Sequence, residues 1–172
     1  MKNFIKTSIL ILSFSIVSVS CDDLVDIEPY YSQDAENFFR NPADYERALT
    51  GAYDLLQTSY LDMWIGEIAS DNSIAGGESV TDSEGLHQID AMTHGGLNNE
   101  LRSLFRFMYA GIARVNYIFE FKDNIEFIGK DRILAEAAFL RAYYYFELVK
   151  FFGDVPYVST RLSASDVSSQ QR

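Results

Sequence analysis

The chain has 172 residues, a formal net charge of −11, 48% hydrophobic residues and 15% aromatic residues. This length suits one domain, and the composition excludes an intrinsically disordered protein. So acidic a chain offers no basic stripe to neutralise phosphates, and no nucleic-acid partner is expected.

The first 21 residues have the pattern of an export signal. Lys2 and Lys6 give a positive start, residues 9–19 form an apolar run, and small residues lead up to Cys21. The run is too short to span a bilayer as a helix. Cys21 is the only cysteine, so it has no disulfide partner within the chain. We expect a lipoprotein signal peptide at 1–20 and lipidation of Cys21; the alternative is a plain secretory signal with a chance cysteine.

An acidic segment closed by Pro29 follows, and we interpret residues 21–33 as a tether. A short helix is expected around residues 34–39. Asn41 and Pro42 then provide an N-cap and a first helical residue. Apolar residues follow at steps of three and one, which predicts a helix; they are Tyr45, Ala48, Leu49, Ala52, Tyr53 and Leu56.

Residues 60–69 have helical spacing, and Asp71 and Asn72 end that helix. From residue 70 to 96 no period is sustained, which predicts a long irregular loop. Loops of this length are often functional, so Asp71, Asn72 and His94 are candidate ligand contacts. His87 and His94 lie near acidic residues, but a metal site needs three or more converging ligands. Polar loop composition accounts for them, and neither a metal nor another cofactor is expected.

Two long helices complete the pattern. The first is capped by Asn98 or Asn99 and runs to about Phe121; apolar residues on two faces predict an inner helix. The second begins at Asp131 and ends before Gly153. It is apolar nearly all round, which predicts deep packing. Its small residues would let a neighbouring helix approach closely; they are Ala135, Ala137, Ala138 and Ala142.

No convincing β-type alternation occurs, so the sequence predicts an all-α fold. Four or five helices in antiparallel succession are similar to helix pairs of the tetratricopeptide kind, with one long irregular loop. No nucleophile-elbow serine or phosphate-binding glycine loop is present. Glu67, Asp71 and Glu78 are carboxylates that a glycosidase could use, but carboxylates near helix ends are usually solvated or serve as caps. No enzyme activity is expected.

Arg141 lies on the helix that is otherwise apolar. A charge on such a surface must be paired or reach solvent. We expect a structural ion pair across helices, with Glu67 or Asp71 as the acid. A ligand-binding role for Arg141 is the alternative.

Residues 135–156, from Ala135 to Pro156, closely resemble the signature helix of SusD/RagB-type lipoproteins of Bacteroidetes. Shorter pieces resemble the same family in the same order. They are residues 26–29, 38–41, 48–53, 70–72 and 111–116. The resemblance spans roughly residues 21–158.

This resemblance implies a cell-surface protein on the outer membrane, lipid-anchored and facing the exterior. It implies binding of a nutrient, a glycan or a peptide, and delivery to a SusC-like TonB-dependent transporter. Residues 34–158 would be the N-terminal helical domain, and 159–172 a polar tail cut from a longer protein, because family members are much longer. A truncated piece would expose an apolar face. The alternatives are a helical-repeat adaptor that binds only a partner protein, and a glycan-cleaving enzyme.

Overall fold

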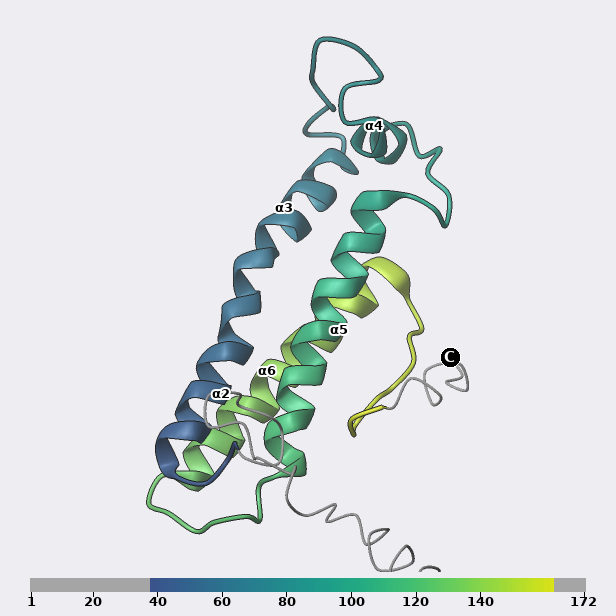
Figure 1. The fold of residues 1–172 in the computed structure, drawn as a ribbon. Helices are drawn as coiled ribbons and strands as arrows, with labels where there is room; N and C mark the ends of the chain where they lie inside the picture. The colour runs from purple at the N-terminus through teal and green to yellow at the C-terminus, as the bar shows by residue number, and fades with distance from the viewer. Residues whose placement is uncertain (1–37, 163–172) are drawn as a thin grey trace, which may run out of the picture. The chain divides into compact units, whose positions relative to one another are not determined.

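The computed structural model describes residues 38–162, which form one helical unit (Figure 1). Its elements are α2 (Pro42–Asp54), the 3₁₀ helix η2 (Leu55–Thr58), α3 (Ser59–Ile68), α4 (Glu84–Asp90), α5 (Asn99–Glu120) and α6 (Lys130–Phe152). No strand occurs within residues 38–162, so the predicted all-α fold is confirmed. The expected signal peptide, tether and lipidated Cys21 lie outside the described residues.

The start of α2 follows the predicted cap. The Asn41 side chain accepts from the backbone N–H of Asp44 at 3.2 Å, and the Asp44 carboxylate accepts from the Asn41 N–H at 3.2 Å. This reciprocal capping box satisfies N–H groups that the first helical turn leaves free. Of the helix expected over 34–39, only Phe38 and Phe39 are described, and neither is helical.

Three helical rods run side by side: the first is made of α2, η2 and α3, and the other two are α5 and α6. α2, η2 and α3 follow one another as a single rod (Figure 1). Tyr45 near the start of α2 donates to the carbonyl of Phe121 just after α5, so α2 and α5 are antiparallel. Contacts of α6 with α2 and α3 advance in the same direction, from Arg132 with Glu46 to Lys150 with Asp62. α5 therefore pairs antiparallel with α6, as tetratricopeptide-like helices do.

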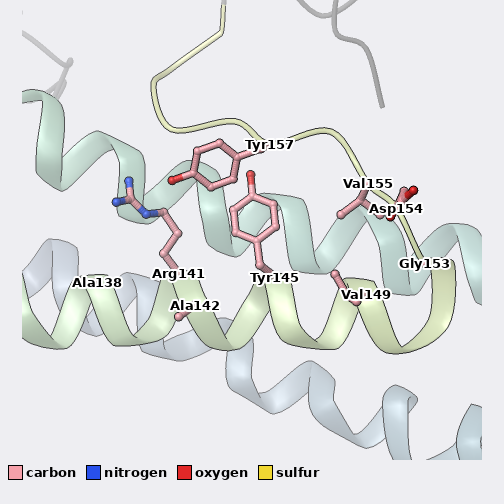
Figure 2. A pocket seen from close by; sticks show the side chains of 9 residues that line it. All are labelled: Ala138, Arg141, Ala142, Tyr145, Val149, Gly153, Asp154, Val155 and Tyr157. Carbon is pink, nitrogen blue, oxygen red and sulfur yellow. The ribbon is translucent and has the colours of Figure 1, made fainter.

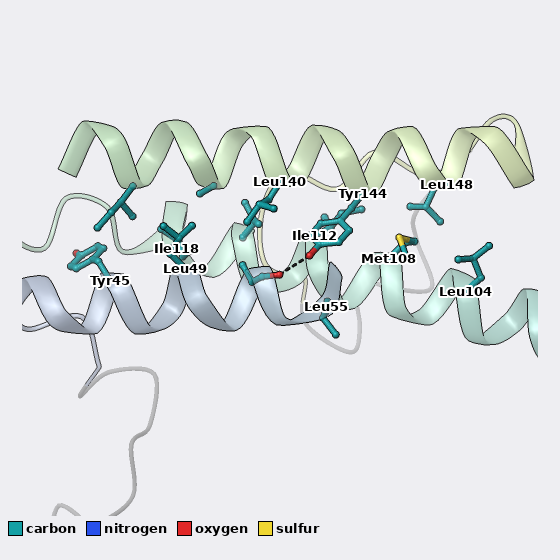
Figure 3. Packing of buried hydrophobic residues seen from close by; sticks show 14 of the residues in the cluster. Tyr45, Leu49, Leu55, Leu104, Met108, Ile112, Ile118, Leu140, Tyr144 and Leu148 are labelled. Carbon is teal, nitrogen blue, oxygen red and sulfur yellow. Dashed lines mark hydrogen bonds between the residues drawn. The ribbon is translucent and has the colours of Figure 1, made fainter. Parts of the chain in front are cut away.

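The core lies where α2, α5 and α6 meet around Tyr144 (Figure 3). Its hydroxyl donates to the carbonyl of Ala52 at 2.6 Å, and burial raises the pKa of Tyr144 to about 12. Gly111 of α5 leaves room for the ring, since a Cβ at that position would lie 2.5 Å from a Tyr144 ring carbon. Close packing of α5 against α6 at this level therefore depends on Gly111. Of the α6 alanines singled out from the sequence, Ala137 is buried in the core, whereas Ala135, Ala138 and Ala142 are exposed.

The long loop contains a helix that the sequence pattern did not predict. α4 has seven residues, and Gly85 within it weakens any local helical preference. Tertiary contacts hold it. Asn98 caps α5 by accepting from the N–H groups of Glu100 and Leu101, and its amide donates to the Gly85 carbonyl at 2.9 Å. Ile89 of α4 is buried in the core.

The expectation that α6 is packed all round is wrong for one face. Ile133, Leu140 and Leu148 point inward and are buried. On the other side Phe139 is 69% exposed, Phe146 62% and Val149 53%. Ala135, Ala138 and Ala142 are exposed as well. The predicted exposed apolar face is therefore present on α6. No helix among residues 38–162 is both long and apolar enough to cross a membrane.

Candidate functional site

The segment after α6, residues 153–162, is called the strap here. Gly153 ends the helix with φ 64°, a left-handed conformation that favours glycine. The strap then turns back along α5 and α6 (Figure 1). Tyr109 donates to the Pro156 carbonyl at 2.7 Å, and Tyr145 accepts from the Val158 N–H at 2.6 Å. Asn116, 1% exposed, donates to the Val158 carbonyl at 2.9 Å.

A hollow of about 720 Å³ lies between the strap and α6 (Figure 2). We call it the α6 groove. Its lining residues are Ala138, Arg141, Ala142, Tyr145, Val149, Gly153, Asp154, Val155 and Tyr157. The rings of Tyr145 and Tyr157 stand 5.2 Å apart, tilted by 35°, and form one wall. Tyr157 is 68% exposed, while Tyr145 is half-buried and fixed by its bonds to the strap.

Arg141 is held at the edge of the α6 groove by α5. Its guanidinium donates to the Asn116 side-chain oxygen at 3.0 Å and lies over the Phe119 ring, 4.5 Å from its centre. It also donates to the Ser159 carbonyl at 3.5 Å. A guanidinium has five N–H donors, so donors remain for a ligand in the groove.

Together these groups combine an aromatic wall with charged groups at the rim. A sugar ring presents C–H faces, which pack on an aromatic ring, and hydroxyls, which bond to charged groups such as Arg141 and Asp154. The groove therefore has the chemistry to hold a sugar. Within residues 38–162, no three His, Cys, Asp or Glu side chains come close enough to hold a metal ion.

A second hollow of about 800 Å³ lies on the other side of the strap, against α5. Phe105, Phe107 and Tyr109 of α5 and Leu162 of the strap are among its lining residues. Arg106, Arg114 and Arg161 also line it, so this hollow combines an apolar surface with three cations.

The three loop residues proposed from the sequence do not line either hollow. Asp71, Asn72 and His94 are all exposed. The backbone N–H of Asn72 donates to the Ser70 hydroxyl at 3.2 Å, a local turn contact. Their role in ligand contact stays a prediction.

Arg141 and Glu67 are not an ion pair in the described residues. Glu67 accepts from the Ser73 hydroxyl at 3.0 Å, while Arg141 bonds to Asn116. The reason is position along α6. Gly66 faces the ring of Phe151, so Glu67 lies beside the end of α6. Arg141 comes ten residues before Phe151, which is about 15 Å along a helix axis.

Sequence reasoning missed Tyr145, Tyr157 and Asp154 as a group. Tyr145 looked like one more aromatic residue of a buried helix. Nothing in the local pattern shows that residues 153–162 fold back over α6. Asn116 on α5 was the available signal, because a polar residue on an apolar stripe needs hydrogen-bond partners. In the structure those partners are the strap and Arg141.

Comparisons with known proteins point to one family. A family profile described as "Starch-binding associating with outer membrane" matches residues 23–172. SusD-like protein P38 of Formosa agariphila is 28% identical over 181 residues, covering 99% of this chain and 34% of the relative. SusD-like protein P2 of the same organism is 27% identical over 179 residues, covering 98% and 34%. The chain thus spans about a third of the length of these relatives.

No solved structure matches the chain significantly. The profile match includes all of the described helices, from α2 to α6, together with the strap. It also includes residues 135–156, which carry the most specific resemblance in the sequence. The chain belongs to the SusD-like family.

Proposed function

We propose that this protein binds a glycan at the outside of the outer membrane and passes it to a SusC-like TonB-dependent transporter. The observation that carries the proposal is the match of residues 23–172 to a family described by starch binding and association with the outer membrane. That description names binding rather than a reaction, which favours a binding protein over an enzyme.

Within the described residues, the α6 groove is the proposed sugar contact. Its support is the Tyr145–Tyr157 wall, the fixed Arg141 guanidinium and the open volume of about 720 Å³. Asp71, Asn72 and His94 remain proposed contacts in the loop. A peptide cargo is the second candidate, because peptide backbones also bond to arginine and carboxylate groups.

The proposal includes the anchor. Residues 1–20 act as a lipoprotein signal peptide, Cys21 carries lipid, and residues 21–33 tether the helical domain. The basic start, apolar run and lone Cys21 support this. Cys21→Ala is expected to abolish incorporation of labelled fatty acid. Labelling that persists in this variant would contradict the anchor.

Starch binding is tested by native electrophoresis in gels with and without starch. We expect starch to retard the protein, and Tyr157→Ala to reduce that retardation. Tyr60→Ala is the matched control, because Tyr60 is also an exposed tyrosine but lies on α3 away from the groove lining. Unretarded migration would reject starch as cargo, and release of reducing ends would show an enzyme instead.

A further inference from the structure

The hollow against α5 gathers positive charge in an acidic protein. Arg106 and Arg114 of α5 and Arg161 of the strap line it, and none of the described residues that line it is an aspartate or a glutamate. We call this site the arginine hollow. The chain as a whole has 25 acidic and only 14 basic residues. An anion that is repelled by the chain overall is therefore attracted to this one hollow.

The three arginines differ in how far their charge is already neutralised. Arg114 pairs with Asp54 at 3.2 Å, and Arg161 pairs with Glu120 at 3.2 Å. Arg106 is exposed, and within residues 38–162 no acidic side chain lies within ion-pair distance of it. Three cations against two acids leave one positive charge, and Arg106 supplies it.

Arg114 and Arg161 can still donate hydrogen bonds to a ligand. Each of their ion pairs uses a single nitrogen, Nη1 of Arg114 and Nε of Arg161. A guanidinium has five N–H donors, and its planar fork binds the paired oxygens of an oxyanion. Arg106 and Arg114 are eight residues apart on α5, which is about 12 Å along the helix axis. A ligand that contacts both must be extended.

Aromatic rings stand beside the unpaired charge. Phe105 and Phe107 flank Arg106 in the sequence and are 36% and 40% exposed. The ring of Tyr109 lies 4.6 Å from that of Phe105, and its hydroxyl donates to the carbonyl of Pro156. The site thus offers apolar ring surface and a cation within one turn of helix. Its ligand should carry an apolar face and an anionic group close together.

An acidic sugar meets this requirement. Its ring presents C–H faces that pack on aromatic rings, and a carboxylate or sulfate group is fixed to the same ring. An acidic peptide also carries carboxylates, but on flexible side chains that lose rotamer freedom when they bind. We infer that the arginine hollow binds an acidic glycan, one whose units carry carboxylate or sulfate groups. The inference rests on glycan binding as proposed above and adds the charge of the cargo and a second contact surface.

Matched pairs of polysaccharides test the requirement for charge. The full chain is titrated calorimetrically with polygalacturonate and its neutral methyl ester, and with dextran sulfate and neutral dextran. We expect the charged member of at least one pair to bind about fivefold tighter or more, because it adds a charge-assisted hydrogen bond at a partly exposed site. This preference should shrink as the salt concentration rises. A preference in only the first pair would identify the carboxylate as the recognised group, and in only the second pair the sulfate.

Substitution of arginines on α5 tests the position. Arg106→Gln should weaken binding of the preferred charged polysaccharide about fivefold, because Arg106 supplies the net charge of the hollow. Arg102→Gln is the matched control, since Arg102 is also an exposed arginine of α5 but does not line the hollow. It should bind as the parent does. A circular-dichroism melt of both variants checks that the fold is kept.

Equal affinities for the charged and neutral members of both pairs would overturn the inference, and so would equal losses in Arg106→Gln and Arg102→Gln. Poly-glutamate that binds as tightly as the charged polysaccharides would also overturn it and would indicate an acidic polypeptide as the occupant. These failures differ from a failure of the proposed function. If starch retards the protein but charge gives no preference, only the acidic cargo is rejected. If no polysaccharide binds, glycan binding itself is rejected.

Discussion

The two sides of α6 have similar apolar content in sequence but opposite environments. On the inner side Leu140 is 1% exposed, whereas the adjacent Phe139 on the outer side is 69% exposed. The inner side is covered by α2 and α5, whereas Phe139 and Phe146 on the outer side are exposed. Apolar residues all round a helix therefore do not show that every side of it is buried by the same segment of chain.

The largest expected difference in the free energy of unfolding is between Leu140→Ala and Phe139→Ala. Leu140→Ala should lower the free energy of unfolding by about 2–5 kcal/mol, because it leaves a cavity in the core. Phe139→Ala should change it by about 0.5 kcal/mol or less, because the Phe139 side chain is mostly exposed. Urea denaturation of both variants measures the contrast. Similar losses would mean that the outer side is packed in the monomer.

The next prediction concerns the glycine that admits Tyr144. Gly111→Ala should destabilise the fold by about 1–3 kcal/mol, since the new Cβ would lie 2.5 Å from the Tyr144 ring. Gly51→Ala is the matched control, because Gly51 is also helical and a Cβ added there would meet nothing within 4 Å. That control should gain about 0.5–1 kcal/mol. A loss in both variants would point to a general intolerance of alanine and not to the close α5–α6 approach.

A smaller effect is expected at the Tyr144 hydroxyl. Tyr144→Phe keeps the ring but removes the bond to the Ala52 carbonyl, which should cost about 1 kcal/mol. In the unmodified protein, ionisation of Tyr144 should begin well above pH 10, because burial raises the pKa to about 12. Spectrophotometric titration of the variant and the parent identifies that group. Ionisation of every tyrosine near pH 10 would show that the inner side of α6 admits water.

The smallest expected effect is a pH dependence of stability, which comes from Glu147 on the inner side of α6. Glu147 is 3% exposed, and burial raises the pKa of its carboxyl, as does its hydrogen bond with Asp62, while Lys150 at 2.5 Å opposes the shift. The folded state thus holds this proton more tightly than the unfolded state does.

Stability from this group is therefore present below its ordinary pKa of 4.5 and decreases as the pH rises through the folded pKa. The free energy of unfolding of Glu147→Gln should therefore vary less than that of the parent between pH 4.5 and the raised pKa of Glu147. Denaturation at a series of pH values measures it. A variant with the same pH slope as the parent would assign the slope to other groups.

Local signals explain which features could be predicted. Asn41 and Asn98 cap helices as expected, since a cap depends on residues within one turn. Gly153 ends α6 for the same reason. The bounds of the long helices were therefore predictable, and so was the all-α fold.

Features set by distant partners could not be predicted. α4 exists because Asn98 and buried Ile89 hold it, and neither contact has a local signature. The Arg141–Asn116 bond depends on the register of α5 against α6, which one helix pattern does not contain. The α6 groove depends on the path of the strap. The site was less predictable than the fold because it forms between α6 and the strap, and the sequence pattern does not show that the strap folds back over α6.

The hydrogen bonds that fix the strap end on its main chain. Tyr109 bonds to the carbonyl of Pro156, Asn116 to those of Val158 and Thr160, and Tyr145 to both backbone groups of Val158. Side chains at these strap positions can therefore be exchanged during evolution without releasing the segment. Related proteins could use this freedom to diversify what they recognise while keeping the same scaffold.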